Sequence, residues 1–163
     1  MFQRMLLPID GSDLALQAAK AGIELAQSES AEVVGLFVTT PYSVPYVYPG
    51  EIPLAFPSKT EYEKAVRREA EACLRKLADT AVAAGVTWTQ AIVSSISAAP
   101  AIIAVAKKQK CDLIVIGSHG RGGFGQLLLG SVTSKVLSSC HVPVLVYRGK
   151  APKSTAKTRA KAK

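Results

Sequence analysis

The sequence has few of the residues that mark membrane, disulfide-rich or metal-binding proteins. Its three cysteines, Cys73, Cys111 and Cys140, are odd in number and widely spaced, so they predict neither a disulfide framework nor a CxxC metal or redox motif. The longest apolar runs, such as residues 98–106, are about half of the roughly 20 residues that span a bilayer. No sustained apolar stretch with a small-residue cleavage site opens the chain. We therefore expect no membrane segment and a location in the reducing cytoplasm.

Acidic residues are missing from the C-terminal end. The formal net charge is +8, and seven of the 20 basic residues lie from Arg148 onward, where no acidic residue occurs. The other 13 nearly balance the 12 acidic residues. We predict one folded domain over residues 1–148 and a basic, disordered tail over residues 149–163. Such a tail is either simply solvated or binds nucleic acid or acidic partners in a salt-sensitive, sequence-blind way.

Apolar runs of strand length alternate with segments of helical periodicity. Because strands separated by helices need crossover connections, the pattern predicts an α/β fold with one doubly wound open sheet of five parallel strands, in the order 3-2-1-4-5, and helices on both faces. Ligands of such sheets bind outside the carboxyl ends of the strands, here the first and fourth. We expect strands at residues 5–9, 33–38, 86–93, 112–116 and 142–147, and helices beginning near Ser12, Ser58, Ser97 and Ser131.

Local signals predict where the first two helices begin and end. Ser12 is expected to cap the first helix. Ser58 with Glu61 forms a capping-box pattern at the start of the second, and Gly85 suits its left-handed C-terminal position. The first helix has one narrow apolar face, predicted to pack on the sheet, made of Ala15, Ala18, Ala19, Gly22, Ile23 and Ala26.

Between these helices, residues 39–57 hold five of the nine prolines and no helical or strand periodicity. We predict a long irregular loop. Its aromatic side chains would form a ligand lid, a partner surface or the loop's own packing. They are Tyr42, Tyr46 and Tyr48.

A glycine-rich segment follows the fourth predicted strand. Five glycines occupy positions 117–125, and Gly130-Ser131 leads into the fourth helix. Glycines let backbone N–H groups converge on phosphate oxygens, and a helix N-terminus favours the same charge. Ser131 and Thr133 would add hydroxyl donors, while His119 and Arg121 could neutralise phosphate. GxxxxGK[ST] does not occur, and a GxGxxG spacing such as that of residues 120–125 is weak evidence by itself, so the alternative is a flexible surface loop.

The spacing within this segment resembles a known family. Gly117-x2-Gly120-x9-Gly130-Ser131 matches the G-x2-G-x9-G-[ST] pattern of ATP-binding universal stress proteins. The flanking sequences Asp-Leu-Ile-Val-Ile-Gly, Leu-Leu-Leu-Gly-Ser-Val, Val-Pro-Val-Leu-Val and Leu-Pro-Ile-Asp-Gly-Ser also look like the family. The resemblance covers about residues 3–148, outside the proline-rich loop and the tail.

The resemblance implies which residues contact adenosine. Asp10 matches the acidic residue near the adenosine, Val38 the backbone contact to adenine, and Gly117 a residue that lines the ribose. From the residues alone, Asp10 could instead cap the helix from Ser12. Val38 could be only a core residue.

The resemblance also implies how phosphates and partners are bound. His119 lies where the family often has arginine. Dimers are expected through the last strand, residues Val142 to Tyr147, which should lie at a sheet edge. Mg²⁺ or Mn²⁺ is an optional bridge across the phosphates of a bound ATP. The phosphates would be held by the Ser131 hydroxyl and by the backbone amides of four residues: Gly120, Gly130, Ser131 and Val132.

These observations leave three alternative functions for the protein. The first is an ATP-binding regulatory protein of the stress response, and the second is a slow ATPase or phosphotransferase. The third is a nucleic-acid or acidic-partner binder that acts through the tail. The sequence has no Walker-type lysine and no recognisable nucleophile–base pair, and Asp10 and His119 are the nearest acid–base candidates. We predict no catalytic residue and no metal-ligating side chain.

Overall fold

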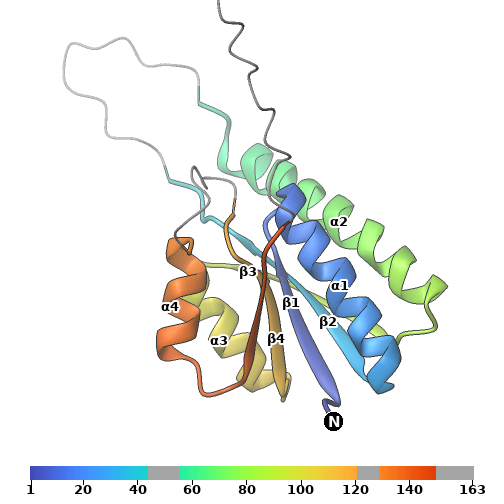
Figure 1. The fold of residues 1–163 in the computed structure, drawn as a ribbon. Coiled ribbons are helices and arrows are strands. Elements are labelled where there is room, and N and C mark those ends of the chain that lie inside the picture. Colours follow the sequence, from blue (N-terminus) through green and yellow to red (C-terminus); the bar gives the residue numbers. More distant parts are fainter. Residues whose placement is uncertain (44–55, 121–128, 150–163) are drawn as a thin grey trace, which may run out of the picture.

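The chain folds into alternating strands and helices (Figure 1). The structure is a computed structural model and describes residues 1–43, 56–120 and 129–149. In chain order, its elements are β1 (Arg4–Ile9), α1 (Asp13–Glu29), β2 (Glu32–Thr39), α2 (Lys59–Ala83), β3 (Trp88–Ser94), α3 (Ala98–Lys108), β4 (Leu113–Gly117), α4 (Ser131–Ser139) and β5 (Val144–Tyr147).

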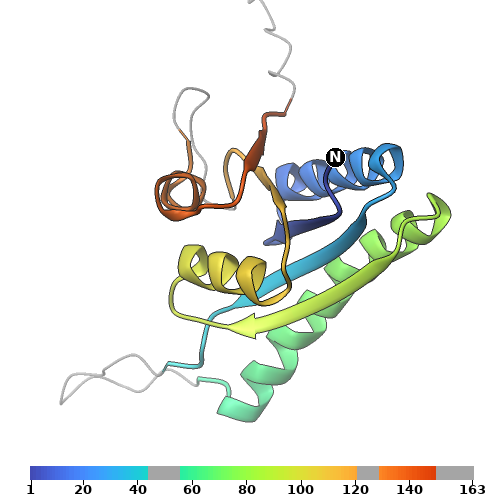
Figure 2. The ribbon, with the colours of Figure 1, turned by 90° about the horizontal axis from the view of Figure 1, so that it is seen from below.

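The strands form one open parallel sheet in the order β3-β2-β1-β4-β5. Helices α1 and α2 cover one face, and α3 and α4 cover the other (Figure 2). This confirms the predicted fold class and strand order. Because β1 lies between β2 and β4, the strand order reverses beside β1, where the predicted site is expected.

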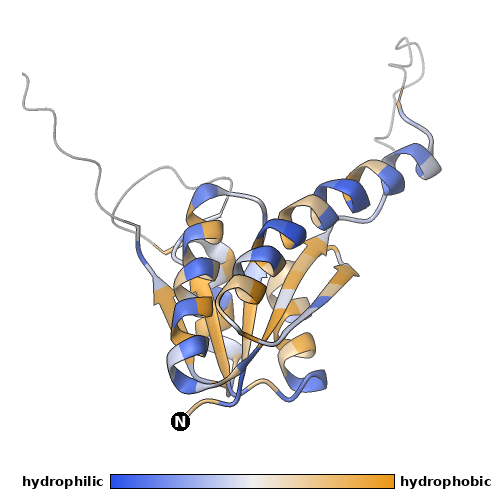
Figure 3. Cartoon of the chain, turned by 90° about the vertical axis from the view of Figure 1, so that its right-hand side faces the viewer, coloured by the Kyte–Doolittle hydropathy of each residue, from blue (hydrophilic) through white to orange (hydrophobic). Residues whose placement is uncertain are grey.

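Two apolar layers lie on either side of the central strands, which are coloured hydrophobic along their length (Figure 3). Met5 and Leu7 face α1 and α2, while Leu6 between them faces α3. Val33 and Val34 alternate in the same way, and all five side chains are buried. Strands covered on both faces are continuous apolar runs, which explains why these segments show no polar alternation.

Helix α1 packs on the sheet through the six residues that the sequence predicts. Ser12 caps it, accepting a hydrogen bond from the Ala15 N–H. Gly22 permits the close approach, because a Cβ built on it would lie 2.5 Å from the Leu7 Cδ2. The small residues of this face therefore set the distance between helix and sheet.

Helix α2 begins and ends as predicted. Ser58 and Glu61 form a reciprocal capping box, and the Ser58 hydrogen bonds lower the pKa of the Glu61 carboxyl. Gly85 has φ +70°, a left-handed conformation suited to glycine. The first turns of α2 extend beyond the sheet (Figure 3), and its buried residues all lie in the later turns: Ala70, Leu74, Leu77 and Ala81.

Two strands begin two residues later than predicted, for reasons in the backbone hydrogen bonding. Before β3, the Val86 N–H still donates to the Ala81 carbonyl at the end of α2. Before β5, the Val142 N–H donates to the Cys140 Sγ, and Pro143 has no N–H. These residues therefore form turns rather than strand.

The predicted irregular loop begins at Thr40, since Thr39 belongs to β2. Only its ends are described. The Tyr42 hydroxyl donates to the Pro57 carbonyl, and its ring lies 5.5 Å from that of Tyr62, which donates to the Thr40 carbonyl. Tyr42 therefore joins the two ends of the loop. Tyr46 and Tyr48 lie outside the described residues, as does the predicted tail from residue 150 onward.

The three cysteines are free thiols. Burial raises the pKa of the Cys111 thiol to about 11, whereas Cys73 and Cys140 are half-buried. Among the described residues, no helix is both long and apolar enough to cross a membrane.

Replacing Gly35 with alanine should destabilise the fold. A Cβ built on Gly35 would lie 2.4 Å from the Trp88 ring and 3.0 Å from the Leu74 Cδ2. Overpacking of this kind costs about 1–3 kcal/mol, measured as the loss in free energy of unfolding in urea. In a Trp88→Leu background the same substitution should cost clearly less, because the ring is gone. An equal cost in both backgrounds would show that the ring is not the obstacle.

Cys111 should react with a thiol reagent more slowly than the other two cysteines. Its side chain is 5% exposed, and a thiol with a pKa of about 11 carries about one thiolate in a thousand at pH 8. Mass spectrometry after timed alkylation at pH 8 should show that Cys73 and Cys140 are modified first in the native protein. In urea, where the protein is unfolded, all three cysteines should be alkylated at comparable rates. Equal rates in the native protein would contradict this prediction.

Candidate functional site

A cavity of about 330 Å³ lies at the carboxyl ends of β1, β2 and β4, the upper edge of the sheet in Figure 1. The structure brings all eight sequence-predicted site residues to its wall: Asp10, Val38, Gly117, His119, Gly120, Gly130, Ser131 and Val132. Thr133, which the sequence suggested as a hydroxyl donor, also lines the cavity. Six further lining residues were not predicted: Pro8, Ile9, Ala15, Ala98, Ile102 and Ile116.

Backbone hydrogen bonds fix the two ends of the glycine-rich segment. The Gly130 N–H donates to the Ser118 carbonyl at 2.8 Å, so the segment between them leaves and returns at one point. The Ser118 N–H donates to the Tyr147 carbonyl of β5, also at 2.8 Å. The start of α4 is therefore held against the ends of β4 and β5.

Thr133 does not have the role expected for it. Its side chain is 2% exposed, and its hydroxyl donates to the Gly117 carbonyl at 2.8 Å. The hydroxyl proton is thus used to join α4 to β4, which corrects the expectation of a free phosphate donor. Ser131, in contrast, is exposed at the first position of α4 and lines the cavity.

Close approach explains two of the glycines. A Cβ built on Gly120 would lie 2.5 Å from the Asp10 Oδ2. One built on Gly130 would lie 3.2 Å from the His119 Cα and 3.3 Å from the Ser118 carbonyl oxygen. Because Gly130 has φ −60°, contact and not an unusual backbone angle favours glycine there.

Two helices begin at the cavity without a side-chain cap. Neither Gly130 at the start of α4 nor Ser97 at the start of α3 provides a side-chain hydrogen bond to the first turn. Ser131 and Val132 of α4 and Ala98 of α3 line the cavity. Uncapped N–H groups and the positive end of the helix dipole favour an anion, so α4 presents a suitable environment for phosphate.

Asp10 combines both roles that the sequence left open. Its Oδ1 accepts hydrogen bonds from the Ser12 N–H at 3.0 Å and the Ser12 Oγ–H at 2.7 Å, so it supports the residue that caps α1. It also lines the cavity beside Gly120. A structural function in the β1–α1 turn therefore does not remove Asp10 from the site.

His119 has one engaged and one unengaged ring nitrogen. Its Nδ1 lies 2.9 Å from the Ser118 Oγ. Its Nε2 is buried and has no hydrogen-bond partner among the described residues. A buried polar atom of this kind is uncommon and points to a missing partner, such as a ligand.

Apolar side chains form the other wall. Val38 is half-buried at the end of β2, and Ile102 and Ile116 are buried. Together they offer a surface for a flat, weakly polar group in the same cavity as the donors of α4. The sequence signal for Ile102 was its inward position on α3, but nothing in the local sequence indicated that this position faces a cavity.

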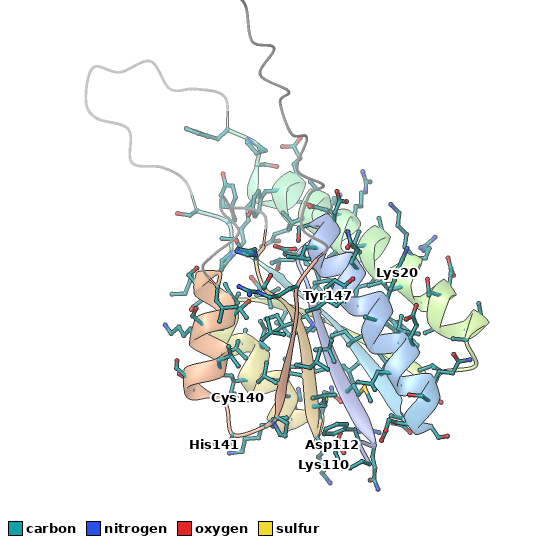
Figure 4. The ribbon with its side chains drawn as sticks, in the orientation of Figure 1. Lys20, Lys110, Asp112, Cys140, His141 and Tyr147 are labelled. Carbon is teal, nitrogen blue, oxygen red and sulfur yellow. The ribbon has the colours of Figure 1, made fainter. Side chains whose placement is uncertain are left out.

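Two residues remain, a predicted phosphate ligand and the second histidine of the chain. Arg121 is outside the described residues. His141 lies with Cys140 in the turn from α4 to β5, near Lys110 and Asp112 and at the opposite end of the sheet (Figure 4). In the described part of the chain, no group of three His, Cys, Asp or Glu side chains could hold a metal ion.

A second hollow, of about 630 Å³, lies between α2 and the end of β3. Its charged side chains form i,i+4 ion pairs within α2: Lys59 with Glu63 at 3.9 Å and Arg67 with Glu71 at 2.8 Å. It lacks the uncapped helix ends and glycine segment of the first cavity. The cavity at β1 and β4 is therefore the stronger candidate.

The chain is similar to several known proteins. Residues 1–148 match the model of the universal stress protein family. The chain is 33% identical over 151 residues to universal stress protein MJ0531 of Methanocaldococcus jannaschii, covering 91% of this chain and 83% of that protein. It is 35% identical over 156 residues to universal stress protein YxiE of Bacillus subtilis, covering 91% and 100%.

Solved structures share the fold. The structure of hypothetical protein MJ0577 has a TM-score of 0.75 at 24% identity and covers 93% of this chain and 99% of that chain. The structure of a universal stress protein in complex with cAMP has a TM-score of 0.66 at 24% identity and covers 90% of this chain and 97% of that chain. The structure of the universal stress protein from Archaeoglobus fulgidus in complex with dAMP has a TM-score of 0.60 at 19% identity and covers 88% of this chain and 96% of that chain. With the matched family model and relatives, this fold and glycine spacing establish that the chain belongs to the universal stress protein family.

Proposed function

We propose that this protein is an ATP-binding regulatory protein of the stress response, in the G-x2-G-x9-G-[ST] subgroup of its family. The observation that carries the proposal is one cavity that is lined both by apolar side chains and by the uncapped N-terminus of α4. A nucleotide has the matching chemistry, since its base is flat and weakly polar and its phosphates are anionic. Two proteins of the same fold, solved with cAMP and dAMP, support an adenine nucleotide.

In this proposal the base lies by Val38 and Ile102, and the ribose lies near Asp10 and Gly117. The phosphates lie at α4, where backbone N–H groups of helix residues and the Ser131 hydroxyl can donate. Gly120 and Gly130 leave room for the phosphate oxygens because side chains at these positions would fill the space near Asp10 and His119. Val132 contributes its backbone N–H from the first turn of α4.

The proposed function needs no catalytic residue. Asp10 and His119 are the titratable side chains among the described lining residues, and each has a hydrogen bond to a neighbouring serine. A bridging Mg²⁺ or Mn²⁺ needs about six oxygen ligands. Asp10 is the one carboxylate among these lining residues, so the phosphates and water would supply most ligands.

We also propose a homodimer through β5 and a cytoplasmic location. β5 lies at an edge of the sheet, where its outer backbone groups can pair with a second copy across a two-fold axis. Pro143 precedes the strand, so its missing N–H does not interrupt such pairing. The three free thiols agree with a reducing compartment.

Mg-ATP should stabilise the protein. A ligand that binds only the folded state, at 100 times its Kd, adds about 2.7 kcal/mol, which corresponds to a rise in Tm of about 5–10 °C for a domain of this size. Differential scanning calorimetry should show this rise, and Gly130→Asp should abolish it, because the new carboxylate would occupy the phosphate position at α4. No shift and no bound nucleotide in the wild-type protein would refute the proposal.

Because an aspartate at position 130 would also crowd His119 and Ser118, a milder variant is needed. Ser131→Ala removes one exposed hydroxyl donor and should weaken ATP binding about tenfold, measured by calorimetric titration. Ser138→Ala, on the same helix and outside the cavity, should bind ATP as the wild type does. Equal affinities for all three proteins would remove Ser131 from the site.

The proposed dimer has its own test. Leu145 of β5 is 40% exposed and would be covered by a partner strand. At tens of micromolar, the wild type should sediment as a dimer and Leu145→Glu as a monomer, since the carboxylate would be buried without a partner. Val82→Glu, at a 73% exposed position on α2, should remain dimeric. A monomeric wild type would contradict the interface.

A further inference from the structure

We propose that His119 links nucleotide binding to pH: its Nε2 donates a hydrogen bond to a phosphate oxygen, and a positively charged imidazole binds that phosphate more tightly than a neutral one. Affinity for phosphate-bearing adenosine ligands then rises as the pH falls from 8.5 to 5.5. This inference rests on the proposed function and specifies how that site recognises phosphate.

The first support is the state of the two ring nitrogens. The Nδ1 of His119 lies 2.9 Å from the Ser118 Oγ, while Nε2 is buried without a partner among the described residues. When the hydroxyl donates to Nδ1, the single proton of the neutral ring lies on Nε2. A buried N–H with no acceptor costs free energy, which an incoming phosphate oxygen would recover.

The second support is the choice of serine as the partner of Nδ1. A hydroxyl can donate to a neutral ring and, after rotating, accept from a protonated one. Ser118 is therefore compatible with both charge states of His119. Its backbone is fixed by hydrogen bonds to Tyr147 and Gly130, and its side chain is buried, so the ring is held in place in both states.

The third support is the position of the ring relative to α4. The backbone of His119 lies against Gly130, because a Cβ built there would be 3.2 Å from the His119 Cα. His119 and the first turn of α4 line the same cavity. A phosphate that accepts from the uncapped α4 amides then lies in the cavity that His119 also lines. Charge-assisted hydrogen bonds are about twice as strong as neutral ones.

No other described group facing the cavity can produce this pH dependence. Asp10, from the end of β1, is the one other titratable residue among the described lining residues, and its carboxylate already accepts two hydrogen bonds from Ser12. Imidazole ordinarily changes charge in this range of pH. The remaining lining residues of α1, β2, α3, β4 and α4 do not titrate there: Ala15, Val38, Ala98, Ile102, Ile116, Ser131, Val132 and Thr133.

The experiment uses ligands whose phosphates keep their charge. The terminal phosphate of ATP gains a proton in this range, whereas the diester of cAMP and the pyrophosphate of ADP-ribose do not. Calorimetric titration of the full chain at pH 5.5 to 8.5 should show at least one of these ligands binding about five- to tenfold more tightly at pH 5.5 than at 8.5. Adenosine, which has no phosphate, should bind equally at every pH.

Two histidine variants complete the test. His119→Gln keeps a hydrogen-bond donor but cannot change charge, so its affinities should be independent of pH. His141→Gln, at the opposite end of the sheet, should retain the wild-type pH dependence. Both variants must unfold cooperatively when followed by the fluorescence of Trp88. Persistence of the pH dependence in His119→Gln would overturn the proposal.

The result also separates this inference from the proposed function. If ATP or adenosine binds but neither charge-constant ligand gains affinity at low pH, only the role of His119 is wrong. If ATP, cAMP, ADP-ribose and adenosine all fail to bind at every pH, the proposed function fails and the inference fails with it. By reciprocity, a ligand that binds more tightly at low pH must also take up protons on binding, which calorimetry in buffers of different ionisation enthalpy detects.

Discussion

The hydrogen bond between the Gly130 N–H and the Ser118 carbonyl is the contact on which the candidate site depends. It brings the end of β4 and the start of α4 together, so that the eleven residues between them begin and end at the cavity. A side chain at position 130 would meet the backbone of residues 118 and 119. The glycine is required there for contact, and the absence of its side chain leaves the first turn of α4 open to a ligand.

The two ends of the sheet have different chemistry. At the amino end, the Asp112 carboxylate accepts from the N–H groups of Gln3 and Arg4. The Arg4 guanidinium donates to Glu32, which raises the pKa of the guanidinium. Polar groups at that end thus satisfy one another. At the carboxyl end, the first turns of α3 and α4 lack side-chain caps, and the His119 Nε2 lacks a described partner. The buried Trp88 Nε1, at the start of β3, is an exception at the amino end, since it also lacks a described partner. The two uncapped helix ends and the His119 ring nitrogen nevertheless occur together where the strand order reverses, which is where such folds bind ligands.

The same backbone network joins the cavity to the edge of the sheet. Ser118 donates to the Tyr147 carbonyl of β5, and Thr133 joins α4 to the Gly117 carbonyl of β4. The strand proposed for dimer contact and the helix proposed for phosphate binding are therefore both hydrogen-bonded to Gly117 and Ser118, at and just after the end of β4. A connection of this kind would hold the proposed phosphate donors in position before a ligand arrives, which would lower the entropic cost of binding.

The sequence by itself determined the fold class and the inward face of α1, whereas the predicted strand order was established by the structure. Continuous apolar runs such as Val33 to Phe37 identify strands covered on both faces, and small residues such as Ala18 and Gly22 at helical spacing identify a helix packed close to a sheet. The spacing of the glycines and the position of Asp10 after a strand also indicated which residues gather at one edge. Each of these signals is a spacing between residues close together in the chain, and such spacings can be read directly from the sequence.

Only the tertiary structure decided which polar groups of the site are already engaged. The hydroxyls of Ser131 and Thr133 look equivalent in sequence, but one faces the cavity and the other donates to Gly117. Two further features could not be read from the sequence, because both depend on contacts in the folded chain: the lack of a partner for the His119 Nε2 among the described residues, and the contribution of Ile102 to the cavity. Hydrogen bonding is satisfied between neighbours in space, and spacing along the chain does not determine which neighbours those are.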